Sequence, residues 1–139
     1  MLDIFASPDV YQIEEKVPQG ESTHEDGRGS IQRIDRVGGK VNILATKKSF
    51  ARAGDLHKNT QFGYVFHGRV EVWTWENGKT IKRTYSARDS MEFAPGIPHL
   101  FIFREDSLIA EWWDGDFDCW YFKPYRKYVE DRSLIPDEE

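Results

Sequence analysis

The stretch APGIPHLF (residues 94–101) places two prolines, a glycine and a histidine directly before an apolar run. Pro95 and Pro98 fix their own φ angles and Gly96 permits a positive φ, so this turn is expected to be stiff. The residue that follows such a turn enters its strand with little conformational freedom. The stretch therefore predicts that His99 is held in a defined position at the start of a strand, as a site residue would be.

Short segments typical of β-strands lie on both sides of this turn. The strongest is FGYVFHGRVEVWTW (62–75), and Asn77-Gly78 follows it closely, the preferred pair for a two-residue hairpin turn. The segment KVNILATKKSF (40–50) alternates and places three apolar residues on one face: Val41, Ile43 and Ala45. Several short strands at this spacing predict an all-β sandwich or barrel.

The two ends of the chain are expected to add helical segments. Ser7-Pro8-Asp9 is typical of a helix start, which predicts a short helix over about 8–15 or a loop that resembles one. Residues 18–30 are polar and glycine-rich and are expected to form a loop. Apolar residues at helical spacing after Pro124 predict a helix over about 124–134, packed on the barrel or on a partner chain. The chain is thus expected to be one domain, 1–139, with its barrel core at about 30–122.

The amino-acid composition limits which partners the protein is expected to bind and in which compartment it is expected to lie. The 139 residues carry a formal net charge of −5 and the pI is about 5.4, so nucleic acid and anionic membranes are not expected partners. The sequence shows no basic segment followed by an apolar stretch at its start and no run approaching ~18 apolar residues, so a cytoplasmic location is expected. The single cysteine, Cys119, excludes an intrachain disulfide and is expected to be a packed thiol without chemistry.

The segment Pro95-Gly96-Ile97-Pro98-His99 resembles the second conserved motif of the cupin superfamily. The first cupin motif supplies two histidines two residues apart, then a glutamate, then a glycine at the next turn. Counting back from Gly68 places Gln61 at the glutamate position, His57 at the second histidine position and Asp55 at the first. The resemblance implies a cupin-type jelly-roll β-barrel with a ligand cavity at one mouth.

The resemblance leaves two kinds of site open. Asp55, His57, Gln61 and His99 stand where a metal-binding cupin has three histidines and a glutamate, and two histidines with one carboxylate can hold a divalent metal such as Fe, Mn, Zn or Ni. Strand alternation lets residues 55 and 57 face the same way. The alternative is a polar pocket that binds no metal, in which His57 or His99 is the catalytic base.

Two short stretches resemble the sugar-nucleotide epimerase and ketoisomerase branch of the cupins, DGRGSI (26–31) and HKNTQF (57–62). This resemblance implies that Arg28 pairs with a nucleotide diphosphate. Further substrate-binding candidates are three residues expected inside or at the edge of the cavity: Gln61, His67 and Phe101.

Three functions therefore remain open for a small cupin. The first is an isomerase or epimerase that acts on a small polar substrate, such as a sugar nucleotide, by histidine acid–base chemistry. The second is a metal-dependent oxygenase or isomerase, and the third is a binding cupin without catalysis. A homodimer is expected, because the resemblance implies it and the surplus of aromatic residues suits a chain contact.

Overall fold

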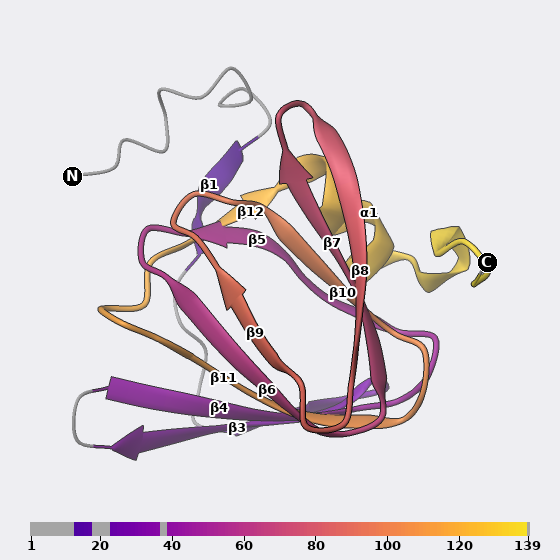
Figure 1. Ribbon diagram of the computed structural model, residues 1–139, viewed down its shortest axis with the longest axis horizontal. Coiled ribbons are helices and arrows are strands. Elements are labelled where there is room, and N and C mark those ends of the chain that lie inside the picture. Colours follow the sequence, from indigo (N-terminus) through magenta and orange to yellow (C-terminus); the bar gives the residue numbers. More distant parts are fainter. Residues whose placement is uncertain (1–12, 18–22, 37–38, 139) are drawn as a thin grey trace.

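Two antiparallel six-stranded sheets face each other across the molecule (Figure 1). The computed structural model describes residues 13–17, 23–36 and 39–138. The first sheet runs in the order β1 (Ile13–Val17), β12 (Cys119–Phe122), β5 (Ala51–His57), β10 (His99–Phe103), β7 (Arg69–Glu76) and β8 (Lys79–Ser86). The second runs in the order β2 (Thr23–Asp26), β3 (Gly29–Arg36), β4 (Gly39–Thr46), β11 (Ser107–Trp113), β6 (Gln61–His67) and β9 (Ser90–Phe93). The all-β, jelly-roll prediction is confirmed.

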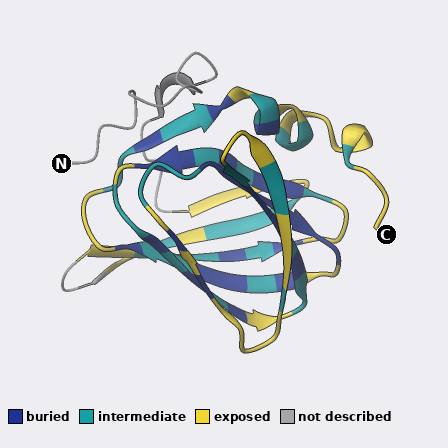
Figure 2. Ribbon diagram, turned by 45° about the horizontal axis from the view of Figure 1, so that its top comes forward, coloured by how far each residue is buried: buried dark blue, intermediate teal, exposed yellow. Residues whose placement is uncertain are grey.

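The inner faces of the two sheets make the core, as the dark strands of Figure 2 show. The turn between β7 and β8 has positive φ at Asn77 and Gly78, 54° and 76°, which is the hairpin geometry that this pair predicts. One core cluster fills the space between the sheets: Leu44, Val65, Val70, Val72, Met91, Phe93, Phe101, Phe103 and Ile109. Apolar packing therefore fills the part of this space that lies beside the cavity described below.

The C-terminal helix α1 (Lys123–Glu130) lies on the outer side of the first sheet and is followed by a 3-10 turn, η3 (Arg132–Leu134). Tyr125 is its buried residue and packs edge-on against Trp73, with ring centroids 6.1 Å apart. The predicted helix over 124–134 is thus shorter and is broken at Asp131. No helix in the described ranges combines the length and the apolar character needed to cross a membrane.

The N-terminal predictions need two corrections. Residues 8–12 of the expected helix lie outside the described residues, but residues 13–15 belong to β1, which pairs with β12. The expected loop over 18–30 is wrong for residues 23–30, because β2 and the start of β3 form a hairpin there. The side chains of β2 are all exposed, so no apolar periodicity marks this strand, and the hairpin is held by the backbone ladder and by bonds from Arg28 to Asp26.

A bulge in β5 changes which side chains face inward. Ala53 and Gly54 both have positive φ, 73° and 67°, and the pairing of β5 with β10 shifts at this point. Arg52 and Asp55 are three residues apart and would face opposite sides of a regular strand, but the bulge lets both line one cavity. Arg126 of α1 fixes the bulge from outside by donating to the carbonyl of Ala53 at 2.8 Å.

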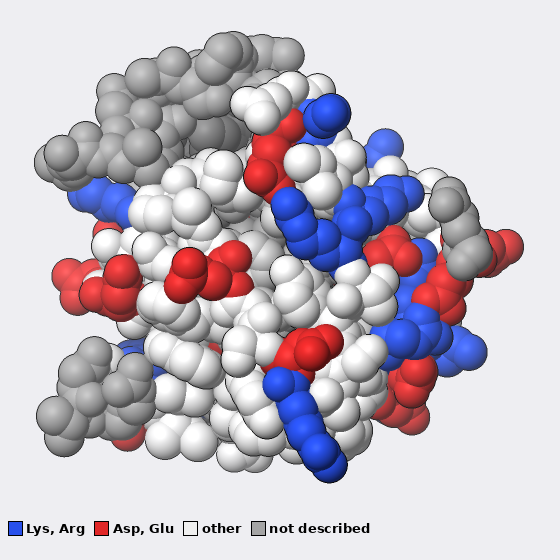
Figure 3. Space-filling view, viewed as in Figure 1, with Lys and Arg blue, Asp and Glu red and all other residues white. Residues whose placement is uncertain are grey.

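The outer surface carries mixed charge. On the face shown in Figure 3, several basic side chains adjoin one another, and acidic side chains border them.

Candidate functional site

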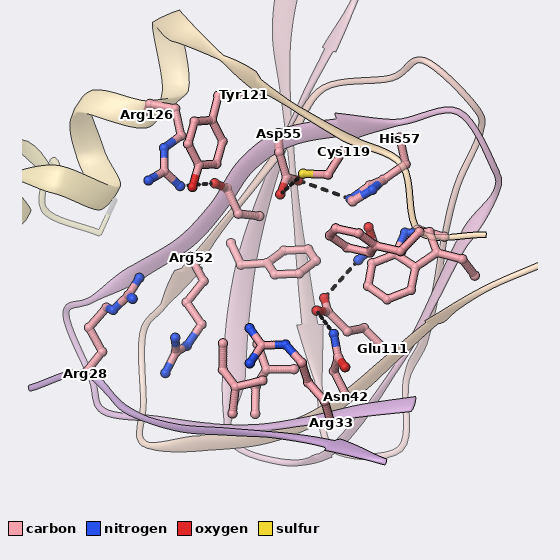
Figure 4. A pocket seen from close by; sticks show the side chains of 17 residues that line it. Arg28, Arg33, Asn42, Arg52, Asp55, His57, Glu111, Cys119, Tyr121 and Arg126 are labelled. Carbon is pink, nitrogen blue, oxygen red and sulfur yellow. Dashed lines mark hydrogen bonds and ion pairs between the residues drawn. The ribbon is translucent and has the colours of Figure 1, made fainter. Parts of the chain in front are cut away.

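A cavity of about 280 Å³ opens between the two sheets (Figure 4). Its wall mixes titratable, amide and apolar side chains: Arg28, Ile31, Arg33, Asn42, Leu44, Arg52, Ala53, Asp55, His57, Gln61, Phe101, Glu111, Trp113, Phe117, Cys119, Tyr121 and Arg126. Five of the predicted site residues are therefore brought together here: Arg28, Asp55, His57, Gln61 and Phe101.

Strand pairing explains why the acidic and imidazole groups converge at one end of this cavity. Asp55 and His57 lie on the same face of β5, and His99 is the residue directly opposite Asp55 on β10. The carboxylate oxygen Oδ1 of Asp55 lies 3.3 Å from Nε2 of His57 and 3.2 Å from Nε2 of His99. The stiff turn before β10 thus delivers His99 to the centre of the site, where its side chain is 1% exposed.

The second nitrogen of each histidine faces a backbone carbonyl. Nδ1 of His57 lies 3.1 Å from the carbonyl of Asp118, and Nδ1 of His99 lies 3.1 Å from the carbonyl of Ile97. A carbonyl can only accept, so both Nδ1 atoms carry a proton and both Nε2 atoms are directed at Asp55. Trp113 and Phe117 pack on the His57 ring, with centroids 5.0 and 5.5 Å away, and hold its orientation.

Cys119 adds a sulfur to this group. It lies opposite His57 on β12, and its Sγ donates to Oδ2 of Asp55 at 3.3 Å. The ligand atoms of Asp55, His57 and Cys119 all lie within 4.8 Å of one another, close enough to hold one metal ion. Burial raises the pKa of the Cys119 thiol, and the neighbouring Asp55 adds to the rise. The thiol is buried, as the sequence predicts, and its raised pKa favours the protonated form when no metal is bound.

The electrostatics of Asp55 and His57 depend on each other. Burial alone would raise the pKa of Asp55, but the charges of His57 and His99 outweigh burial and hold that pKa well below its usual range. Burial opposes protonation of His57, but the Asp55 carboxylate outweighs it and raises the pKa of His57. With no metal bound, each of the two groups thus favours the charged form of the other.

This pair predicts a specific pH dependence for the metal-free protein. His57 has a raised pKa in the folded state, so its contribution to stability is fully present below the unfolded value of 6.5 and is lost as pH rises through the folded value. Urea unfolding with a chelator present should therefore give a free energy of unfolding that declines at alkaline pH. The decline should be smaller in Asp55→Asn, and an equal decline in both proteins would contradict the charged pair.

Gln61 engages only its amide nitrogen, since its amide oxygen is buried and has no hydrogen-bond partner among the described residues. Nε2 of Gln61 donates to Glu111 at 3.0 Å, and the amide of Asn42 donates to the other oxygen of the same carboxylate at 3.2 Å. Burial raises the pKa of Glu111, although the hydrogen bond from Asn42 opposes the rise. The cavity thus holds a second acidic group that the sequence analysis did not single out.

Two predicted residues occupy different positions. Arg28 lies at the β2–β3 turn, on the cavity wall, with its guanidinium paired to Asp26 at 2.6 Å. His67 ends β6 as an exposed residue and lines a separate surface groove beside Thr46 and Ser107. The structure therefore places His67 apart from His57 and His99.

The fold and site define the class of protein. Two antiparallel sheets with a cavity lined from β5, β6 and β10 make a cupin fold, and solved structures share it. No protein-family model matches the sequence, and no curated protein matches it.

The similar structures can be named individually. CapF, solved with the inhibitor 3-isopropenyl-tropolone, has 17% identity and a TM-score of 0.64 over 73% of this chain and 33% of that chain. A deletion mutant of oxalate decarboxylase OxdC from Bacillus subtilis has 16% identity and a TM-score of 0.62 over 72% and 29%. Another structure of that decarboxylase, described with Mn(II) centres, has 19% identity and a TM-score of 0.59 over 69% and 28%. The chain spans about a third or less of the length of these proteins, and at such identity they establish the fold.

Proposed function

We propose that this protein is a metal-dependent cupin enzyme that acts on a small molecule, with one divalent ion held by Asp55, His57, His99 and Cys119. The observation that carries the proposal is the convergence of two Nε2 atoms on Oδ1 of Asp55. This oxygen is buried and has no aligned hydrogen bond from any described residue, and the same is true of Nε2 of His99. The contacts between these atoms are therefore close but poorly aligned, and a shared cation would give all of them a well-placed partner.

The donor types narrow the choice of metal. Imidazole and thiolate donors suit Zn²⁺ and Fe²⁺, whereas Mn²⁺ prefers oxygen donors. The carbonyls of Asp118 and Ile97 would fix both rings in the orientation that directs Nε2 to the ion, as outer partners do in metal sites. A bound divalent ion would supply a positive charge that polarises an oxygen of the ligand.

Glu111 is the residue on this wall best placed to hold or transfer a proton. Its carboxylate lines the cavity and is oriented by Asn42 and Gln61. Because burial raises the pKa of Glu111, it exchanges protons closer to neutral pH than an exposed glutamate does. Aromatic side chains beside His57 restrict the access of water to this end of the cavity.

A second candidate is metal-free acid–base chemistry of the isomerase or epimerase type. The observation that favours it is the raised pKa of His57, which keeps this residue protonated to a higher pH than an ordinary histidine and so available as an acid. The cavity size argues for a small substrate in either case. A volume of about 280 Å³ lies just below the ~300–1,000 Å³ typical of ligand pockets, which favours a ligand smaller than a sugar nucleotide.

Metal content distinguishes the two candidates. Elemental analysis of untagged protein should find one divalent metal per chain, and chelation should remove it. His57→Ala and His99→Ala should each weaken metal binding by more than ~100-fold, since loss of a ligand costs more than loss of an outer partner. His67→Ala is the matched control, because this exposed histidine lies in another groove, and it should keep the metal. If the wild type holds no metal and neither Zn²⁺ nor Fe²⁺ raises its melting temperature, the metal-free candidate replaces the proposal.

A further inference from the structure

Arg52 presents a buried cation to the cavity. It is the second residue of β5, only 3% exposed, and the bulge at Ala53 turns it inward. Its Nε donates to the hydroxyl of Thr46 at 2.7 Å. Its two terminal nitrogens are buried and have no hydrogen-bond partner among the described residues. A guanidinium does not readily lose its proton. We therefore expect the cavity beside these two nitrogens to hold a hydrogen-bonding partner for them.

The surroundings of Arg52 increase its need for an anion. Figure 4 shows Arg28, Arg33 and Arg52 gathered at the end of the cavity away from His57. Burial lowers the pKa of Arg52 to about 10, and the charge of Arg28 adds to this effect. The charges of Asp26 and Glu111 oppose this effect, but Asp26 already forms an ion pair with Arg28. None of these groups gives the two terminal nitrogens of Arg52 a hydrogen-bond partner within the described residues.

We infer that the ligand of this cavity is a small organic acid whose carboxylate is bound by the two terminal nitrogens of Arg52. The inference deepens the proposed function and rests on it for the reacting end of the ligand. The bulge in β5 places the anion-binding group and the Asp55–His57 group in one cavity, three residues apart along the strand. A ligand held by Arg52 would extend toward His57.

A carboxylate fits this end better than a phosphate does. The terminal nitrogens of a guanidinium form a planar fork that matches the two oxygens of a carboxylate. A phosphate carries more charge and usually needs further donors, but Arg28 is engaged with Asp26, and Arg126 donates to the carbonyl of Ala53. The apolar wall formed by Ile31, Leu44 and Phe101 also suits the carbon skeleton of an organic acid.

The test compares two buried arginines that differ in their partners. Arg104 is buried, as Arg52 is, with 8% of its surface exposed. Unlike Arg52, its guanidinium donates hydrogen bonds to Glu71 and to the carbonyl of Pro136. Chelator-treated protein is titrated calorimetrically with acetate, lactate, malonate, inorganic phosphate and the neutral analogue malonamide. The same titrations are run on Arg52→Met, Arg52→Lys and Arg104→Met, and the melting temperature of each protein without ligand is recorded.

The two arginines should respond in opposite ways. Wild type should bind at least one of the three carboxylates, and Arg52→Met should weaken that binding by at least ~30-fold, while its melting temperature stays equal or rises. Arg104→Met should keep the binding but melt at a lower temperature, because Glu71 loses its partner. Arg52→Lys retains the positive charge but loses the two parallel N–H donors of the guanidinium, and it should weaken binding by ~10-fold. This variant provides the test if Arg52→Met does not fold.

Three results would overturn the inference. They are the absence of binding of any carboxylate at millimolar concentration, equal binding of malonamide, and tighter binding of phosphate than of every carboxylate. These outcomes are separate from the metal test, since the titrations use protein without metal. Carboxylate binding that persists in His57→Ala, a variant without the metal, would support the Arg52 site even if the proposed chemistry failed.

Discussion

Replacing Gly29 by alanine is expected to reduce the free energy of unfolding by more than ~3 kcal/mol. Gly29 begins β3 with φ at +136°, a conformation that residues with a side chain rarely adopt. A Cβ atom there would overlap the carbonyl oxygen of Ala45 on the paired strand β4. That oxygen belongs to the sheet backbone and cannot move aside as a flexible side chain could, so the strain and the clash add.

Gly39 provides a matched control for this change. It has almost the same φ, +137°, but a Cβ atom at Gly39 would meet no atom of the described residues within 4 Å. Gly39→Ala should therefore show the conformational cost alone, about 1–2 kcal/mol. Urea denaturation of the two variants measures the difference, and equal losses would show that the close approach of β3 to β4 is not rigid. Because Arg28 immediately precedes Gly29, the same packing also positions a residue of the cavity wall.

Replacing Phe122 by alanine is expected to cost about 3–5 kcal/mol, the range for removing a fully buried aromatic side chain. Phe122 is 0% exposed and packs on Trp75 and on Tyr125 of α1, with ring centroids 5.7 and 5.0 Å away. The loss should also loosen α1, so that amide hydrogen exchange in this helix increases. Arg126 would then hold the Ala53 bulge less firmly, which links this core position to the cavity.

Phe66→Ala is the control, because this phenylalanine is 47% exposed at the end of β6. Its replacement should change stability by no more than about 1 kcal/mol. Thermal or urea unfolding of both variants gives the comparison. A loss at Phe122 as small as the loss at Phe66 would mean that α1 does not depend on this contact.

Local signals in the sequence predicted much of the fold and part of the site. The turn before His99 and the pair Asn77-Gly78 act through φ angles fixed by residue type, so their structures follow from short stretches. The spacing from Gly68 back to Asp55 and His57 likewise identified two residues that converge. Such predictions succeed when a few neighbouring residues determine the geometry.

The remaining site residues depend on contacts between distant strands. Cys119 and Glu111 reach the cavity through the pairing of β12 with β5 and of β11 with β6, and no motif surrounds either residue. On β4 the apolar face that contains Val41 and Ile43 is only half-buried, whereas the polar Asn42 faces inward. Arg52 was missed because regular alternation sets it opposite Asp55, and only the backbone bulge reverses that orientation.

The bulge in β5 has a consequence for how the length of a ligand is selected. A strand with strict two-residue alternation brings only every second side chain to one face. A cationic group and an acid–base group that must face the same cavity therefore usually come from separate loops, which move independently. Here one strand carries both a cation and an acid–base group, and the conformation at Ala53 and Gly54, fixed by Arg126, sets their separation. The backbone of β5 therefore fixes the distance between these two groups, and selection of a ligand by its length would not depend on loop closure.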